Sequence, residues 1–167
     1  MKNYSYAEAF LKELNSEMPA TRKCLERIPE NLFDYKPHEK SMTLGYLSLL
    51  VAEIPRWIQI ALEDGEIDFA TFKHFQPKNT EELVAHFDEN TEKAKKALSN
   101  ATEETFSKEF ALKRDGQLLF KVPMIPNISS TLNHWVHHRG QLTVYMRLNN
   151  IPVPSIYGPS ADENPFG

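Results

Sequence analysis

The chain has 167 residues, of which 41% are hydrophobic and 25% charged. This is the composition of an ordinary globular protein, and the length is sufficient to bury a core without disulfides. We therefore predict a single domain over residues 1–167. The formal net charge of -4 and the lack of a basic cluster with interleaved aromatic residues exclude a general nucleic-acid-binding protein.

The sequence also restricts the compartment and the redox chemistry. The N-terminal MKNYSYAEAF lacks the apolar centre of a secretion signal, and the longest apolar stretch, around Leu47 to Ala52, is too short to cross a bilayer. We therefore expect a cytoplasmic protein with no membrane partner. The single cysteine, Cys24, allows no internal disulfide and no cysteine-based zinc cluster, and we expect its thiol to be buried.

Helical periodicity dominates the first half of the chain. Residues 4–28 repeat apolar side chains at steps of three and four, which predicts one helix with a kink at Pro19. A connector containing two prolines follows. A second helix should begin at a cap within residues 41–43 and end at Gly65, with a further kink at Pro55. It is apolar nearly all round, so it should be the most buried helix.

The second half predicts two more helices. A loop over residues 66–79 contains three phenylalanines that need a surface to pack on, and Asn79 or Thr80 can cap a third helix. Strand-forming residues flank Asp115-Gly116, a dipeptide favoured in two-residue hairpin turns. A fourth helix should follow Pro126 and Asn127 and run to about residue 150.

These elements predict an all-α fold. It is a four-helix bundle with a short hairpin or ordered loop between the third and fourth helices, and an irregular C-terminal tail that contains four prolines. Bundles of this kind hold metal and ligand sites on side chains that face inward between the helices. The fold by itself implies no activity.

The fourth predicted helix contains the most informative motif, HWVHHRGQ, at residues 134–141. His134 and His138 are four residues apart and therefore lie on one helix face. Gln141 and Tyr145 fall on the same stripe, in the middle of the apolar face. Because histidine is a common ligand of transition metals, this pattern predicts a metal-binding pair supported by Gln141 and Tyr145. The alternative is a pair that is hydrogen-bonded in the core without a metal.

The other histidines and the carboxylates are weaker candidates. His137 lies beside the stripe and is an alternative ligand, whereas His38, His74 and His86 fall in connectors or on exposed faces and should be solvated. Catalytic zinc usually has three protein ligands. The third ligand would have to come from a facing helix, and the only carboxylate in the middle of the second helix is Glu53.

Three stretches of the sequence resemble the DinB-like (DinB/YfiT) superfamily of bacterial metal-binding four-helix bundles. They are KPHEKSMTLGYLSLLVAEIPRW, NHWVHHRGQLTVYMRL and IPVPSIYGPSADE. The resemblance implies a divalent metal, often nickel or zinc, held by three histidines, two of which match His134 and His138. The third would stand in the second helix, where this sequence has Leu50. Because leucine cannot bind a metal, three outcomes remain open: a weak site on two histidines and water, a site that recruits Glu53, or no metal.

The resemblance also implies a function. Relatives of this kind include thiol-dependent S-transferases and a thiol-dependent isomerase, in which the metal generates the thiolate nucleophile. The leading hypothesis is therefore a metal-dependent bundle that takes a small molecule or thiol as its ligand, with a degenerate metal site. The rival hypothesis is a non-enzymatic module without metal, which binds a small ligand or forms a homodimer through helical faces.

Overall fold

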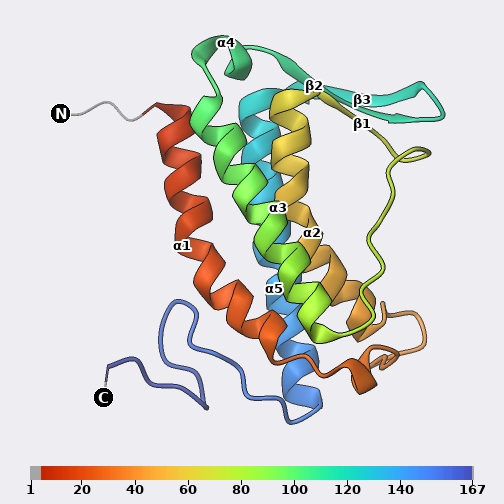
Figure 1. The fold of residues 1–167 in the computed structure, drawn as a ribbon, viewed down its shortest axis with the longest axis vertical. Coiled ribbons are helices and arrows are strands. Elements are labelled where there is room, and N and C mark those ends of the chain that lie inside the picture. Colours follow the sequence, from red (N-terminus) through yellow and green to blue (C-terminus); the bar gives the residue numbers. More distant parts are fainter. Residues whose placement is uncertain (1–4, 167) are drawn as a thin grey trace.

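The computed structural model describes residues 5–166. Four long helices pack as a bundle: α1 (Tyr6–Glu26), α2 (Leu44–Glu63), α3 (Thr80–Asn100) and α5 (Met124–Leu148) (Figure 1). A 3-10 turn, η1 (Glu30–Leu32), lies between α1 and α2, and the one-turn helix α4 (Glu103–Phe106) follows α3. The strands β1 (Glu66–Asp68), β2 (Glu109–Arg114) and β3 (Gln117–Pro123) form a small sheet at one end of the bundle.

The helices begin and end where the sequence supplies caps. The side chains of Ser5, Thr43 and Asn79 each accept a hydrogen bond from the backbone N–H three residues further on, which satisfies a donor that the first helical turn leaves free. After α2, Gly65 has a φ of 74°, a conformation that glycine adopts without steric cost. The predicted starts of the second and third helices are therefore confirmed.

The four long helices form a square in cross-section. Both α1 and α2 pack against α3 and α5, so α1 and α2 occupy opposite corners. Figure 1 shows that the connector after β1 runs from the sheet to the far end of the bundle before α3 begins. As a result α2 and α3 point in the same direction, and α5 runs antiparallel to both.

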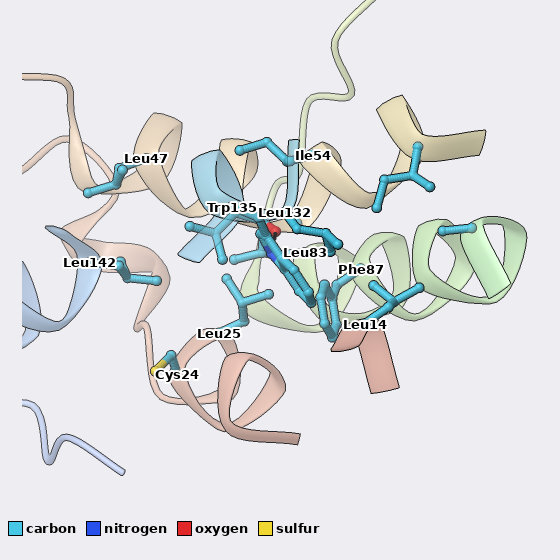
Figure 2. Packing of buried hydrophobic residues seen from close by; sticks show 14 of the residues in the cluster. Leu14, Cys24, Leu25, Leu47, Ile54, Leu83, Phe87, Leu132, Trp135 and Leu142 are labelled. Carbon is cyan, nitrogen blue, oxygen red and sulfur yellow. Dashed lines mark hydrogen bonds between the residues drawn. The ribbon is translucent and has the colours of Figure 1, made fainter. Parts of the chain in front are cut away.

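The core lies between these helices, and its contacts fix the positions of the helices relative to one another along the bundle axis. Trp135 of α5 is 1% exposed, and Figure 2 shows it among Leu132, Leu83 and Phe87. Its indole Nε1 donates a 2.8 Å hydrogen bond to the carbonyl oxygen of Val51 in α2. Nearer the end of α5, Tyr145 donates to the carbonyl oxygen of Met42. These two bonds place the His134–His138 segment level with the middle of α2.

The prediction of an all-α fold was wrong in one respect, because the chain contains a three-stranded sheet. β2 and β3 form the predicted hairpin, and φ is positive at both turn residues, Asp115 and Gly116. The strand that the sequence did not predict is β1, which pairs parallel with β2. Three residues are too few to show an alternating pattern, so a loop was expected there.

The C-terminal tail, residues 149–166, is irregular as predicted. It packs against the bundle through specific bonds rather than through a helix or strand. Nη1 of Arg27 donates to the carbonyl oxygen of Pro152, and Arg147 of α5 pairs with the carboxylate of Asp162. None of the helices within residues 5–166 is long and apolar enough to span a membrane.

Candidate histidine pair and adjoining cavity

The two histidines singled out by the sequence lie together on α5. The Nε2 atoms of His134 and His138 are 2.8 Å apart, and the ring centroids are 4.5 Å apart. Both side chains are partly buried. The two imidazoles therefore present the same ring nitrogen to one another, as expected for side chains four residues apart on one helix face.

Gln141 determines which nitrogen of His138 carries the proton. The side-chain oxygen of Gln141 lies 2.8 Å from Nδ1 of His138, so Nδ1 is the donor of that bond. In neutral His138 this leaves a lone pair on Nε2, directed toward His134. The predicted supporting role of Gln141 agrees with this contact, whereas Tyr145 bonds to Met42 and does not contact the pair.

His134 is held in its neutral form. Burial lowers the pKa of His134, and the nearby His138 and His137 lower it further. Its ring also lies against the indole of Trp57, with the centroids 5.5 Å apart. A neutral His134 either donates a hydrogen bond from Nε2 to His138 or binds a metal through an unprotonated Nε2, so both alternatives are compatible with the pair.

No third metal ligand reaches the pair from the part of the chain that the structure describes. Within residues 5–166, no group of three or more histidine, cysteine, aspartate or glutamate side chains is arranged to hold a metal ion. Leu50, at the position that would carry the third histidine, is 8% exposed in the part of α2 level with the pair. Glu53 is bonded elsewhere, and His137 is exposed on the side of α5.

A cavity of about 270 Å³ adjoins His134. It lies between the sheet, the first half of α5, Trp57 of α2 and the connector after β1. Its walls are mainly apolar and aromatic, with a few polar groups from α5 and the connector. The lining residues are Trp57, Ile67, Phe69, Phe72, His74, Phe110, Leu112, Phe120, Asn127, Ser130, Thr131 and His134.

Glu53 anchors the connector that forms one wall of this cavity. Its carboxylate is completely buried, lies 2.5 Å from Nδ1 of His74 and accepts a 2.8 Å hydrogen bond from the backbone N–H of Phe75. Nε2 of His86 lies 3.5 Å away. Burial alone would raise the pKa of Glu53, but His86, the Phe75 N–H and His74 together lower it, so the carboxylate is ionised.

The expectation that His86 is solvated was wrong. The side chain of His86 is only 11% exposed and stacks on Phe75 with a centroid distance of 4.4 Å, because the connector folds back over α3. His38 and His74 are exposed as expected, although Nδ1 of His74 is also bonded to Glu53. No sequence signal pointed to the Glu53–His74 contact, since it joins a helix to an irregular connector.

The arginine within the histidine motif has a structural position that sequence reasoning missed. Arg139 is 2% exposed and donates hydrogen bonds to Thr21 of α1 and to the hydroxyl of Tyr157 in the tail. Its guanidinium also lies against the carboxylate of Glu17. The HRG segment and the YGP tail are thus joined in space by one buried cation.

Cys24 is buried as predicted, with no exposed surface. Burial raises the pKa of its thiol to about 11. A thiol with this pKa is almost fully protonated at neutral pH and is a poor nucleophile. The chain therefore has no reactive thiol of its own.

The fold and the site together define a helical bundle with a histidine pair beside an apolar cavity. The chain belongs to the DinB family, whose family model matches residues 1–164. The family resemblance predicted from the three sequence stretches is therefore confirmed.

Individual relatives are distant in sequence but similar over almost their whole length. An uncharacterized protein of Bacillus subtilis, YrdA, is 24% identical over 155 residues, which is 92% of this chain and 89% of YrdA. The crystal structure of the DinB-like protein YjoA from Bacillus subtilis superposes with a TM-score of 0.70 at 23% identity, over 89% of this chain and 96% of YjoA. A DinB-like protein from Bacillus cereus also gives 0.70, at 21% identity, over 90% and 97% of the two chains.

Proposed function

We propose that this protein binds a divalent transition metal, nickel or zinc, through His134 and His138, and presents it to a small molecule in the adjoining cavity. One observation carries the proposal: the two Nε2 atoms are 2.8 Å apart, and Gln141 holds the Nδ1 proton of His138 on the side away from His134. Metal-binding histidines commonly donate their second nitrogen to such a partner, which fixes the tautomer that binds the metal.

The distance between the two nitrogens is close to that required by a shared ion. Nitrogens that each bind an ion at about 2.1 Å are about 3 Å apart at the right angle of an octahedral or square-planar ion such as nickel, and about 3.4 Å apart in tetrahedral zinc, so the pair would open to take the ion. The number of ligands fits less well, because Leu50 cannot act as the third. We therefore propose a weak site whose remaining positions are filled by water or by a substrate.

The adjoining cavity favours an enzymatic use of this site. A bound divalent metal would deprotonate a thiol at neutral pH, which supplies the nucleophile of a thiol-dependent transferase. Since Cys24 is buried and protonated, that thiol would come from a separate small molecule. His134 both belongs to the pair and lines the cavity, so a molecule in the cavity would lie next to the ion.

The test is metal binding by untagged protein, measured by elemental analysis and by calorimetric titration with nickel and zinc. His134→Ala and His138→Ala should each abolish binding. His137→Ala is the matched control, because His137 is an exposed histidine on the same helix that does not share the 2.8 Å contact, and it should bind metal like the unaltered protein. Sub-stoichiometric metal that neither substitution changes would refute the proposal.

A second candidate function needs no metal. The burial of Leu50 favours a pair that is simply hydrogen-bonded, with His134 donating from Nε2 to His138, beside a cavity that takes an organic ligand. Homodimerisation is part of this alternative, because Val144 and Leu148 on α5 are 57% and 56% exposed. Light scattering of the unaltered protein and of Val144→Lys/Leu148→Lys tests it: a dimer that becomes a monomer supports this interface.

A further inference from the structure

The cavity beside His134 contains a second histidine that belongs to neither the pair nor the core. His74 lines the cavity wall from the connector after β1, and its side chain is 36% exposed. The Phe72 and Tyr46 rings lie nearly perpendicular to its imidazole, at centroid distances of 5.1 and 6.2 Å. It is held there by the buried carboxylate of Glu53.

This contact determines the protonation of His74. An ionised carboxylate accepts hydrogen bonds and donates none, so the 2.5 Å contact requires a proton on Nδ1 of His74. The lone pair of the neutral imidazole is therefore on Nε2, for which the described residues provide no hydrogen-bond partner. A buried carboxylate that orients an imidazole in this way also stabilises the imidazolium that forms when Nε2 accepts a proton.

The rest of the cavity specifies the shape of a ligand. Six of its lining side chains belong to phenylalanine, leucine or isoleucine on the sheet and connector, and Trp57 adds an indole from α2. Nε1 of Trp57 is buried away from solvent, so this residue adds ring surface rather than a polar group to the cavity wall. A cavity of roughly 150 Å³ with apolar walls holds benzene, so about 270 Å³ accommodates a substituted aromatic ring.

We propose that the cavity binds an aromatic weak acid, a phenol-like molecule, whose hydroxyl proton is accepted by Nε2 of His74. The proton leaves the ligand oxygen, the O–H electron pair stays on that oxygen as phenolate, and the resulting imidazolium remains paired with the Glu53 carboxylate. The ring then lies among the aromatic walls. This proposal does not rest on the metal, because none of the groups that carry it belongs to the His134–His138 pair.

The other ionisable groups around His74 are few. Tyr46 faces it from α2 and His86 approaches the same carboxylate from α3. The guanidinium of Arg56 lies 4.9 Å from the Phe72 ring centroid, and His134 lines the cavity from α5. Among residues 5–166, the carboxylate bonded to His74 is that of Glu53, so the base we propose is the Glu53–His74 unit.

The probe is 4-nitrophenol, whose phenolate absorbs at a longer wavelength than the neutral phenol. It is titrated into chelator-treated protein at a pH about one unit below the probe's own pKa, where most of the free probe is neutral. We expect the phenolate band to grow as the probe binds. 4-Nitroanisole has the same ring but no acidic proton, and it should bind about tenfold more weakly or worse, because it cannot form the charge-assisted bond.

Three variants locate the base. His74→Asn keeps an N–H that can reach Glu53 but removes the Nε2 lone pair, so the probe should bind without the phenolate band. His86→Asn is the matched control, since His86 approaches the same carboxylate but does not line the cavity, and the band should be retained. Phe110→Trp fills the cavity and should abolish binding of both probes.

The outcomes separate this proposal from the proposed metal site. A phenolate band that persists in His74→Asn, or equal binding of 4-nitrophenol and 4-nitroanisole to the unaltered protein, overturns the proposal. A phenolate band that is lost in His134→Ala but retained in His74→Asn would show that the His134–His138 pair, and not His74, accepts the proton of the probe. If His74→Asn does not fold, the comparison of the two probes on the unaltered protein still decides the question.

Discussion

Nη2 of Arg139 lies 2.6 Å from Oε2 of Glu17, and the two side chains are only 2% and 12% exposed. Removing one partner of a buried ion pair leaves an uncompensated charge, which typically costs about 3–5 kcal/mol. We therefore expect Arg139→Met to lose stability on this scale in urea unfolding monitored by circular dichroism. The variant should also loosen Tyr157, which loses its hydrogen bond to the guanidinium and keeps only the one to Glu17.

The control for this prediction is Arg147→Met. Arg147 is on the same helix and also pairs with a carboxylate, that of Asp162, but its side chain is 49% exposed. Because water screens exposed ion pairs, its unfolding midpoint should stay close to that of the unaltered protein. Equal losses of stability in the two variants would show that burial of the Arg139–Glu17 pair does not increase its contribution to the free energy of unfolding.

Leu50→His restores the residue that the family resemblance implies at the middle of α2. If His134 and His138 form a metal site, a third imidazole at that height should tighten nickel or zinc binding by more than about tenfold, measured by calorimetric titration. The double variant Leu50→His/His138→Ala should lose that gain. An unchanged affinity in Leu50→His would mean that α2 does not face the pair as we describe.

Glu53 should make the stability of the protein depend on acid pH. Its folded-state pKa is lowered below the ordinary value of 4.5, so its stabilising contribution is complete above that pH and is lost as the pH falls through the lower folded value. Glu53→Gln should be less stable than the unaltered protein at neutral pH, by about 1–3 kcal/mol, because one of the two acceptor oxygens becomes an NH2 group and one donor loses its acceptor. The difference should shrink on acidification below that ordinary value.

Urea unfolding at a series of pH values measures this effect. Glu104→Gln serves as the control, because the Glu104 side chain is 84% exposed and its variant should follow the unaltered protein at every pH. A gap between Glu53→Gln and the unaltered protein that stays constant down to the most acidic pH would contradict an ionised Glu53 in the folded state.

Cys24 should be inert in the folded protein. Its thiol is completely buried and its pKa is raised to about 11, so both access and ionisation oppose reaction with an aromatic disulfide reagent at neutral pH. The same reagent should react quickly once the chain is unfolded in urea. Rapid reaction of the folded protein would show that the Cys24 thiol is not buried.

The parts of the fold that local sequence signals specify were predicted well. Thr43 and Asn79 mark helix starts because their side chains replace missing backbone acceptors, and Asp115-Gly116 specifies a turn because both residues tolerate a positive φ. β1 was missed because its pairing with β2 depends on contacts between distant segments. A segment of three residues carries no sequence pattern that predicts such a contact.

The same distinction applies to the site. His134 and His138 could be predicted to meet because helix geometry alone brings them together. The contact between Glu53 and His74 could not, because an irregular connector has no period from which its path can be inferred. Arg139 was overlooked for the opposite reason, since a charged side chain on a helix is usually solvated and this one is buried by α1 and the tail.

The cavity has walls from α2, the connector, all three strands and α5, so its lining residues extend from Trp57 to His134 along the chain. It therefore exists only after the parallel pairing of β1 with β2 has closed, a long-range contact that forms slowly in folding. A partly folded chain cannot bind there. Any molecule that occupies the cavity at a concentration about a hundred times its Kd would raise the free energy of unfolding of the whole domain by about 2.7 kcal/mol. A thermal-shift screen of compound libraries on the unaltered protein would therefore detect its ligand through stability alone, with no assay of a reaction.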